Sequence, residues 1–232
     1  MRVALLVPAA GSGSRLGYTE PKALVDVVGV SLLRRTLERL AAAFTFVETV
    51  VLVPDEALSA CEAALADAPA GLGLCVVRVG GATRQQSVHE GLTALVGDAD
   101  IVCVHDGARP LVPAATLREV IAVASRCGAA TAASRPIDSV RIEEGERTRA
   151  LDRARLWLVE TPQAFRRELL ERAHATAEAE HIHGTDDASL VEALGQRIEL
   201  VESAGPNFKV TVEADLLAVR EMLRRESCPT RR

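Results

Sequence analysis

Short apolar runs alternate with segments of helical periodicity along the first 130 or so residues, and no other feature constrains the fold as much. The runs occupy residues 3–7, 47–53, 74–79 and 101–105, and a shorter one lies at 129–133. The first four are each followed by apolar residues spaced three or four apart, which is typical of an amphipathic helix. This alternation predicts an α/β fold, a Rossmann-like, doubly wound and mostly parallel sheet.

The pattern changes after residue 135. Residues 140–151 form two short alternating segments on either side of Gly145 and predict a β-hairpin. A long hairpin that leaves a compact domain is a common means of holding a second subunit, so we expect an arm at about 136–156 that forms a homodimer. Beyond it, helices are expected at about 166–180, 187–194 and 213–225, and a strand at 197–202. We predict a single domain over residues 1–232 with this arm inserted in it.

The loop after the first strand combines Gly11 and Gly13 with two cations, Arg15 and Lys22. Glycines two apart let the backbone turn sharply and bring its N–H groups toward a ligand. An ordinary Gly/Ser-rich connection and a dinucleotide fingerprint are the alternatives, but Leu16 stands where the third glycine of that fingerprint belongs. The chain has no Gly-Lys pair, which excludes a P-loop. These residues favour a nucleoside triphosphate as the ligand.

Polar clusters also follow two later strands, at residues 80–84 and 106–109. Ligands of open α/β sheets bind outside the carboxyl ends of the strands. Because all three clusters fall at such ends, they predict one shared site.

The overall composition limits the function classes. A net charge of −5 without a basic block gives no support to nucleic-acid binding. No membrane-length apolar segment and no signal peptide are evident, so we expect no membrane association and a cytoplasmic location. The five cysteines lack a C-x-x-C pair and are expected to be reduced thiols. A soluble enzyme of the cytoplasm fits these limits best.

Eight motifs resemble, in order, those of the sugar-phosphate nucleotidyltransferases, and more narrowly those of the 2-C-methyl-D-erythritol 4-phosphate cytidylyltransferases. They lie at residues 9–16 with 21–22, 80–88, 104–110, 138–139, 152–153, 161–163, 185–189 and 207–211. The resemblance implies a transferase of the non-mevalonate isoprenoid pathway. With Mg²⁺ as cofactor, CTP and methylerythritol phosphate would give 4-diphosphocytidyl-2-C-methyl-D-erythritol and pyrophosphate.

The resemblance also implies the site residues. It gives a catalytic role to three cations: Arg15, Lys22 and Lys209. It gives nucleotide binding to Ala9, Ala10, Gly11, Ser12, Gly13, Gly81, Ala82, Arg84, Ser87, Asp106 and Gly107. It gives binding of the sugar phosphate to Asp106, Arg109, Ser139, Arg153, Thr161 and Lys209. Asp106 is the protein ligand that it suggests for Mg²⁺, and Ser139 and Arg153 would reach across the dimer into the partner's site.

Two other functions stay open from the sequence. A ribitol 5-phosphate cytidylyltransferase shares the motifs that surround CTP, although residues 84–88 and 185–189 favour the methylerythritol enzyme. A non-catalytic nucleotide-binding module would not need the full set of Arg15, Lys22, Asp106 and Lys209. An NAD-dependent oxidoreductase is disfavoured by the incomplete fingerprint.

Overall fold

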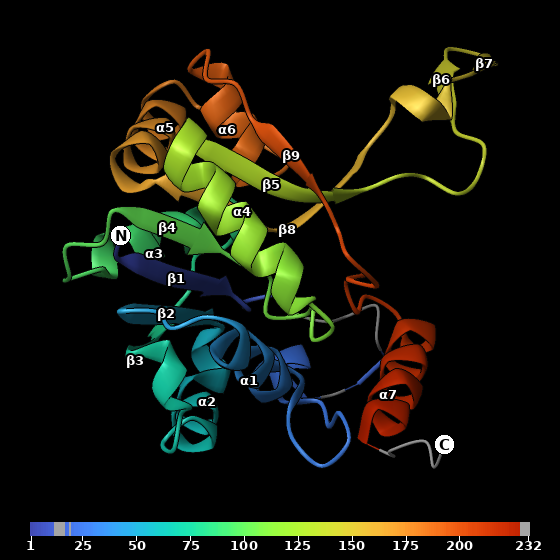
Figure 1. Cartoon of the computed structure of the whole chain (residues 1–232). Coiled ribbons are helices and arrows are strands. Elements are labelled where there is room, and N and C mark those ends of the chain that lie inside the picture. Colours follow the sequence, from blue (N-terminus) through green and yellow to red (C-terminus); the bar gives the residue numbers. More distant parts are fainter. Residues whose placement is uncertain (12–16, 19, 228–232) are drawn as a thin grey trace.

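The computed structural model describes residues 1–11, 17–18 and 20–227. The expected site residues Ser12, Gly13 and Arg15 lie outside these ranges. Within them, a seven-stranded sheet carries helices on both faces, and a two-stranded hairpin stands apart from it (Figure 1).

The strands of the large sheet are β1 (Val3–Pro8), β2 (Glu48–Val53), β3 (Leu74–Val79), β4 (Ile101–Val104), β5 (Ala129–Ser134), β8 (Leu158–Arg166) and β9 (Glu199–Glu202). The helices are α1 (Leu32–Ala43), α2 (Leu58–Ala64), α3 (Arg84–Ala94), α4 (Ala114–Cys127), α5 (Arg167–Ala179), α6 (Asp187–Ala193) and α7 (Glu213–Ser227). Short 3₁₀ helices are η2 (Lys22–Leu24), η3 (Asp55–Ala57), η4 (Ala70–Leu72) and η5 (Arg153–Arg155). The strand order is β3-β2-β1-β4-β8-β5-β9.

The sheet is parallel except for β8, which pairs antiparallel with both β4 and β5. The mostly parallel α/β sheet is therefore confirmed. The sequence analysis did not predict β8, because Pro162 lies within it and proline cannot donate to a strand ladder. The β5–β8 register shifts between Thr131, which pairs with Gln163, and Ala133, which pairs with Val159. Pro162 falls in this irregularity, where no ladder hydrogen bond from its backbone nitrogen is needed.

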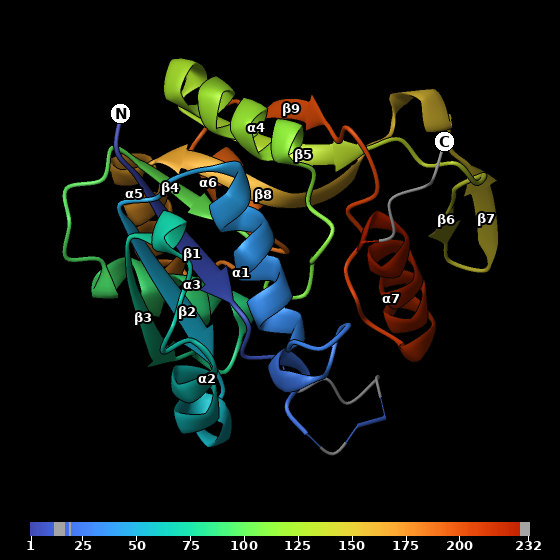
Figure 2. The same ribbon diagram turned by 60° about the horizontal axis from the view of Figure 1, so that its bottom comes forward.

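Alternate residues of the central strands face two separate cores. On β1, Val3, Leu5 and Val7 join the core beneath α1 and α4, whereas Ala4 and Leu6 join the core beneath α3 and α5. This period of two is what a strand covered on both faces requires. Figure 2 shows the helices on either side of the sheet. The two filled cores fix the strand register and therefore the positions of the strand ends.

The expected hairpin is present as β6 (Arg141–Glu144) and β7 (Arg147–Ala150). The turn uses Gly145 at φ +65°, a left-handed conformation that glycine adopts without strain. All eight strand residues are exposed. The hairpin projects beyond the ends of β5 and β8, away from the large sheet (Figure 1).

None of the helices in the described part of the chain combines the length and apolar character that crossing a membrane requires.

Candidate active site

The loops after β1, β3 and β4 meet at the carboxyl edge of the sheet, and small residues allow them to meet closely. A Cβ on Gly107 would lie 2.9 Å from the Cβ of Ala9, and one on Gly80 would lie 2.9 Å from the Cβ of Ala10. Real Cβ atoms do not approach so closely, so glycine lets the three backbones converge. Gly80 and Gly107 are thus required by the packing of the loops.

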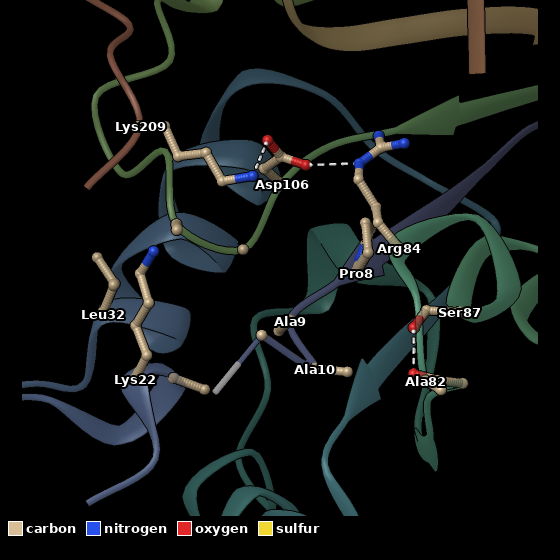
Figure 3. Close-up of a pocket in the computed structure, with 15 residues that line it drawn as sticks. Pro8, Ala9, Ala10, Lys22, Leu32, Ala82, Arg84, Ser87, Asp106 and Lys209 are labelled. Atoms are coloured by element: carbon tan, nitrogen blue, oxygen red, sulfur yellow. Dashed lines mark hydrogen bonds and ion pairs between the residues drawn. The ribbon is translucent and has the colours of Figure 1, made fainter. Parts of the chain in front are cut away.

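A cleft opens where these loops meet (Figure 3). Its walls include eleven residues assigned to the site from the sequence: Ala9, Ala10, Gly11, Lys22, Gly81, Ala82, Arg84, Ser87, Asp106, Gly107 and Lys209. Pro8, Ala23, Leu32 and Ala108 complete the lining. Residues from the three strand ends therefore lie around one hollow, as the strand-end argument predicted, and Lys209, which the resemblance assigned to the site, joins them from the segment after β9.

Asp106 is the buried centre of the cleft. Its Oδ1 accepts from Nε of Arg84 at 3.1 Å, and its Oδ2 lies 3.0 Å from Nζ of Lys209 and 3.4 Å from Nε of Arg109. Burial alone would raise the pKa of Asp106, but the charges of Arg84, Lys209 and Arg109 outweigh it and hold that pKa well below its usual range. Asp106 is therefore a permanent anion that fixes cations around the cleft.

Lys22 and Lys209 are the only lysines among 232 residues, and both line the cleft. Every other side-chain cation of the chain, histidine aside, is an arginine. Lys22 begins η2, and Lys209 comes from the segment between β9 and α7 (Figure 3). An ammonium group on a flexible stem provides a compact charge that follows a moving phosphate, whereas arginine favours a fixed planar contact. The two lysines suit the place where charge moves during a reaction.

Arg84 is held at both ends of its guanidinium. Besides Asp106, it contacts Asp187 at the start of α6, where Nη1 donates to Oδ2 at 2.8 Å. Burial alone would lower the pKa of Arg84. The carboxylates of Asp187 and Asp106 outweigh it and raise that pKa above its usual value, so the guanidinium stays charged. Arg84 begins α3 directly after Thr83, whose side chain caps that helix in a capping box with Gln86.

Thr161, Asn207 and Arg109 surround Asp106 on the side of β8. The backbone N–H of Asp106 donates to Oγ1 of Thr161 at 3.0 Å. The side-chain amide of Asn207 donates to the carbonyl of Thr161 at 2.7 Å, and Nη1 of Arg109 donates to the carbonyl of Asn207 at 2.7 Å. Because Asn207 is buried two residues before Lys209, these bonds determine where Lys209 enters the cleft.

The cleft has an excess of positive charge. Among the described residues, the cations that line it are Lys22, Arg84 and Lys209, and the carboxylate that lines it is Asp106. A triphosphate matches this excess, and a free metal ion does not.

A model of the family described as "IspD: 2-C-methyl-D-erythritol 4-phosphate cytidylyltransferase" matches residues 3–225. The chain belongs to the IspD family. Enzymes of this family that resemble it include one from Deinococcus radiodurans, 45% identical over 216 residues, which cover 93% of this chain and 87% of that protein. Another, from Desulforamulus reducens, is 35% identical over 228 residues, with 97% of each chain covered.

A bifunctional IspD/IspF enzyme from Clavibacter michiganensis is 42% identical over 231 residues, which are 97% of this chain and 55% of that protein. The crystal structure of 2-C-methyl-D-erythritol 4-phosphate cytidylyltransferase from Thermus thermophilus is 38% identical, with a TM-score of 0.78 over 97% of this chain and all of that one. The IspD fold is thus shared over 97% of this chain.

Two of the sugar-phosphate residues expected from the IspD resemblance, Ser139 and Arg153, lie on the arm. Both are exposed, and Nη1 of Arg153 donates to the carbonyl of Ile137 within the arm. Neither lines the cleft of its own chain within the described residues. The arm projects away from the sheet (Figure 1), so these residues do not join this cleft from the same protomer.

Asp187 and Asn207 act at the site although the sequence analysis gave neither a role. Both lie in motifs that carried the resemblance, at 185–189 and 207–211, but a sequence does not show that one of them will bond a cleft arginine and the other a strand end. Their burial, 1% and 2% exposed, is the signal that distinguishes them from surface polar residues.

Proposed function

We propose that this cleft transfers the cytidylyl group of CTP to 2-C-methyl-D-erythritol 4-phosphate, as the IspD family does, giving 4-diphosphocytidyl-2-C-methyl-D-erythritol and pyrophosphate. The observation that carries the proposal is the convergence of Lys22, Lys209 and the buried Arg84–Asp106 pair on a cleft at the carboxyl ends of three strands. The reaction belongs to the non-mevalonate isoprenoid pathway.

The chemistry needs positioning and positive charge more than a base. The nucleophile is a phosphate oxygen of the acceptor, which is already an anion. Its bond to the α-phosphorus forms as the bond from that phosphorus to the bridging oxygen breaks, and pyrophosphate carries the electron pair away. Lys22 and Lys209 stabilise the charge that develops, and Arg84 and Ser87 line the wall beside Gly81 and Ala82, where the nucleoside binds.

Magnesium is the cofactor that we propose, and Asp106 is the residue that could coordinate it. A carboxylate offers about four lone-pair positions, and three donors approach Asp106: Arg84, Lys209 and Arg109. Among the described residues, these donors leave one position, next to the bond from Arg84. No cluster of three metal-ligating side chains exists among the residues that the structure describes. Asp106 would therefore hold Mg²⁺ together with phosphate oxygens of CTP, where the ion would neutralise phosphate charge.

We further propose that two copies pair through the arm, as the sequence analysis expected. Three apolar side chains at its base are exposed: Ile137 at 87%, Leu158 at 52% and Val159 at 45%. Residues 136–156 carry five arginines and five acidic residues, so two arms would not repel each other. Each arm would then bring Ser139 and Arg153 to the partner's cleft, where they would bind the sugar phosphate.

A cytoplasmic location is also proposed. The cytoplasm keeps thiols reduced, and the four described cysteines, Cys61, Cys75, Cys103 and Cys127, are free.

The deciding experiment measures pyrophosphate release with CTP and Mg²⁺, in parallel reactions with methylerythritol 4-phosphate and ribitol 5-phosphate. We expect release with the first acceptor only. Release with ribitol 5-phosphate alone would keep the CTP site and overturn the acceptor. Omission of Mg²⁺, with EDTA present, should abolish release, and unchanged release would contradict the metal requirement.

A labelling experiment measures CTP binding independently of turnover. An amine-reactive reagent modifies only Lys22, Lys209 and the N-terminal amine, because the chain has no other lysine. Met1 precedes β1 at the opposite edge of the sheet and serves as the internal control. We expect CTP to protect both lysines but not Met1. Protection without pyrophosphate release would indicate the non-catalytic alternative.

A further inference from the structure

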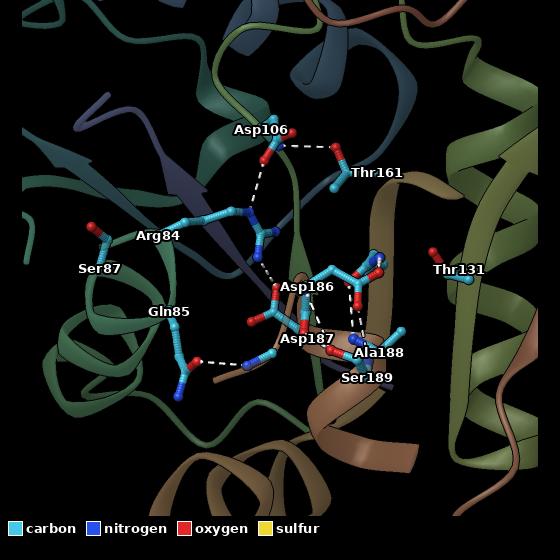
Figure 4. A network of polar contacts seen from close by, with 12 residues as sticks. Arg84, Gln85, Ser87, Asp106, Thr131, Thr161, Asp186, Asp187, Ala188 and Ser189 are labelled. Atoms are coloured by element: carbon cyan, nitrogen blue, oxygen red, sulfur yellow. Dashed lines mark hydrogen bonds and ion pairs between the residues drawn. The ribbon is translucent and has the colours of Figure 1, made fainter. Parts of the chain in front are cut away.

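A chain of polar contacts leads from Arg84 away from Asp106, and Figure 4 shows its first member, Asp187. Arg84 contacts Oδ2 of Asp187, and the other oxygen of Asp187 lies 3.0 Å from Nε2 of His174 on α5. Asp187 and His174 are 1% and 2% exposed. Neither lines the cleft, and neither was assigned a role by the sequence analysis.

The proton positions along this chain follow from the donors and acceptors. Burial alone would raise the pKa of Asp187, but Arg84 and, next, His174 outweigh it and hold that pKa below its usual value. An ionised carboxylate only accepts hydrogen bonds, so Nε2 of His174 carries the proton between them. His174 therefore donates to Asp187, and Asp187 accepts from Arg84.

The geometry leaves Arg84 little freedom. Its guanidinium is planar, and carboxylates bind two edges of that plane, Asp106 at Nε and Asp187 at Nη1. Asp187 is in turn held by His174 from a different helix. Loss of the Asp187–His174 contact would weaken the hold on Nη1 and leave the guanidinium anchored mainly at Nε. Its rotation would then shift the carboxylate of Asp106 and the start of α3. Gly81 and Ala82, which line the cleft, lead through Thr83 into that start.

We propose that Asp187 and His174 are positioning residues of the cytidylyl transfer, which fix Arg84 and, through it, the nucleotide side of the cleft. The inference rests on the proposed function. It differs from a purely structural role because its effect should fall mainly on CTP. Arg84 is expected to contact the nucleotide, whereas Asp106 is the one expected acceptor contact that it bonds among the described residues. Two other expected acceptor contacts, Ser139 and Arg153, lie on the arm.

The test compares five proteins: the wild type, His174→Leu, His174→Gln, Asp187→Asn and His89→Leu. His174→Leu removes the hydrogen-bond donor and replaces the imidazole with an apolar side chain of similar size. We expect it to raise KM for CTP about tenfold, with KM for the acceptor within about twofold of the wild type, since residues of one hydrogen-bond network are coupled by such amounts. His174→Gln places an amide donor near the position of Nε2 and should restore most of the loss.

His89→Leu is the matched control. His89 lies on α3 with its ring 6.2 Å from that of His174, and it pairs with Glu178 and not with Asp187. The same substitution there should leave KM for CTP unchanged. Asp187→Asn, which removes the charge beside Arg84, should raise KM for CTP more than His174→Leu does.

Thermal unfolding of each variant separates positioning from folding. Unchanged kinetics per folded molecule in His174→Leu, with a lower Tm, would overturn the inference, and so would equal increases in KM for both substrates. If Asp187→Asn does not fold, the His174 series still decides the question. Wild-type protein that binds CTP but releases no pyrophosphate would refute the proposed function instead.

Discussion

Lys22 differs from the arginines of the site in the role that its ammonium plays. Arg84 is fixed by two carboxylates, so it shapes the cleft before any ligand arrives. The ammonium group of a lysine stands at the end of a flexible side chain, so it can follow the α-phosphate as charge develops. Charge stabilisation of this kind acts mainly in the transition state.

Lys22→Ala should therefore lower kcat by about 10²- to 10³-fold and weaken CTP binding much less. Steady-state kinetics and calorimetric titration with CTP measure the two effects. Arg172→Ala, which removes an exposed cation of α5, is the control and should change neither. Equal losses in kcat and in CTP affinity would assign Lys22 to ground-state binding.

Gly107 tests how closely the loops meet. A Cβ there would lie 2.9 Å from the Cβ of Ala9 and 3.3 Å from Cδ1 of Leu33, so Gly107→Ala must displace the β1 loop. Overpacking of this kind costs about 1–3 kcal/mol of stability, and we expect CTP affinity to fall as the loop moves. Gly205→Ala is the control, because its Cβ would meet only Pro113 at 3.7 Å. Calorimetry that shows unaltered CTP affinity in Gly107→Ala would contradict the close convergence.

At the scale of elements, the end of β4 carries a buried histidine beside the site. His105 is 0% exposed, and its Nε2 donates to the carbonyl of Arg109 at 3.2 Å. Burial lowers the pKa of His105 from 6.5 to about 4, against smaller opposing effects of the Arg109 carbonyl and Asp106. The ring is therefore neutral at physiological pH, and its low pKa makes it a weak proton acceptor, which argues against a role as a general base.

The same shift predicts a pH dependence of stability. Between pH 6.5 and about 4, His105 binds a proton in the unfolded chain but not in the folded one, so the free energy of unfolding falls as the pH falls through this range. The loss amounts to about 3 kcal/mol by pH 4. His105→Gln should lack this part of the loss, which urea unfolding at pH 7 and pH 4.5 would show. Parallel decreases in the two proteins would contradict the assignment.

The elements predicted from the sequence carry a local hydrophobic pattern, whereas those that were missed depend on their partners in the fold. Strands β1 to β4 were predicted because they are continuous apolar runs, and the arm because Gly145 separates two alternating segments. Strand β8 was missed because Pro162 and polar residues such as Gln163 interrupt its pattern, and only its partners, β4 and β5, make it a strand. The helical segment after the apolar run at 47–53 is not one continuous helix, because it begins as η3 and continues as the short α2.

The site shows the same division. The cleft residues followed from three strand ends and from the family resemblance. Asp187 bonds Arg84 across 103 residues of sequence, and His174 bonds Asp187 from the preceding helix. Periodicity carries no information on contacts between elements.

At the scale of the whole molecule, the arm raises the question of where a complete site forms. The cleft holds the residues proposed for CTP, whereas Ser139 and Arg153 stand on the projecting hairpin (Figure 1). If both sets serve one reaction, the second set must come from another protomer. A two-fold dimer provides two such sites, each built from one cleft and one partner arm.

Mixed dimers test this arrangement directly. Lys22→Ala inactivates the cleft of its own chain, and Arg153→Ala inactivates the site that its arm completes. In a mixed dimer, one site carries both changes and the other carries neither. Half of randomly paired dimers are mixed, so two nearly inactive proteins together should regain about a quarter of the wild-type activity. Dimers verified as mixed by native mass spectrometry that stay inactive would place Arg153 outside the partner's site. Recovery of a quarter of the wild-type activity requires that the intact site works normally beside an inactive one. A smaller recovery would therefore measure coupling between the two sites.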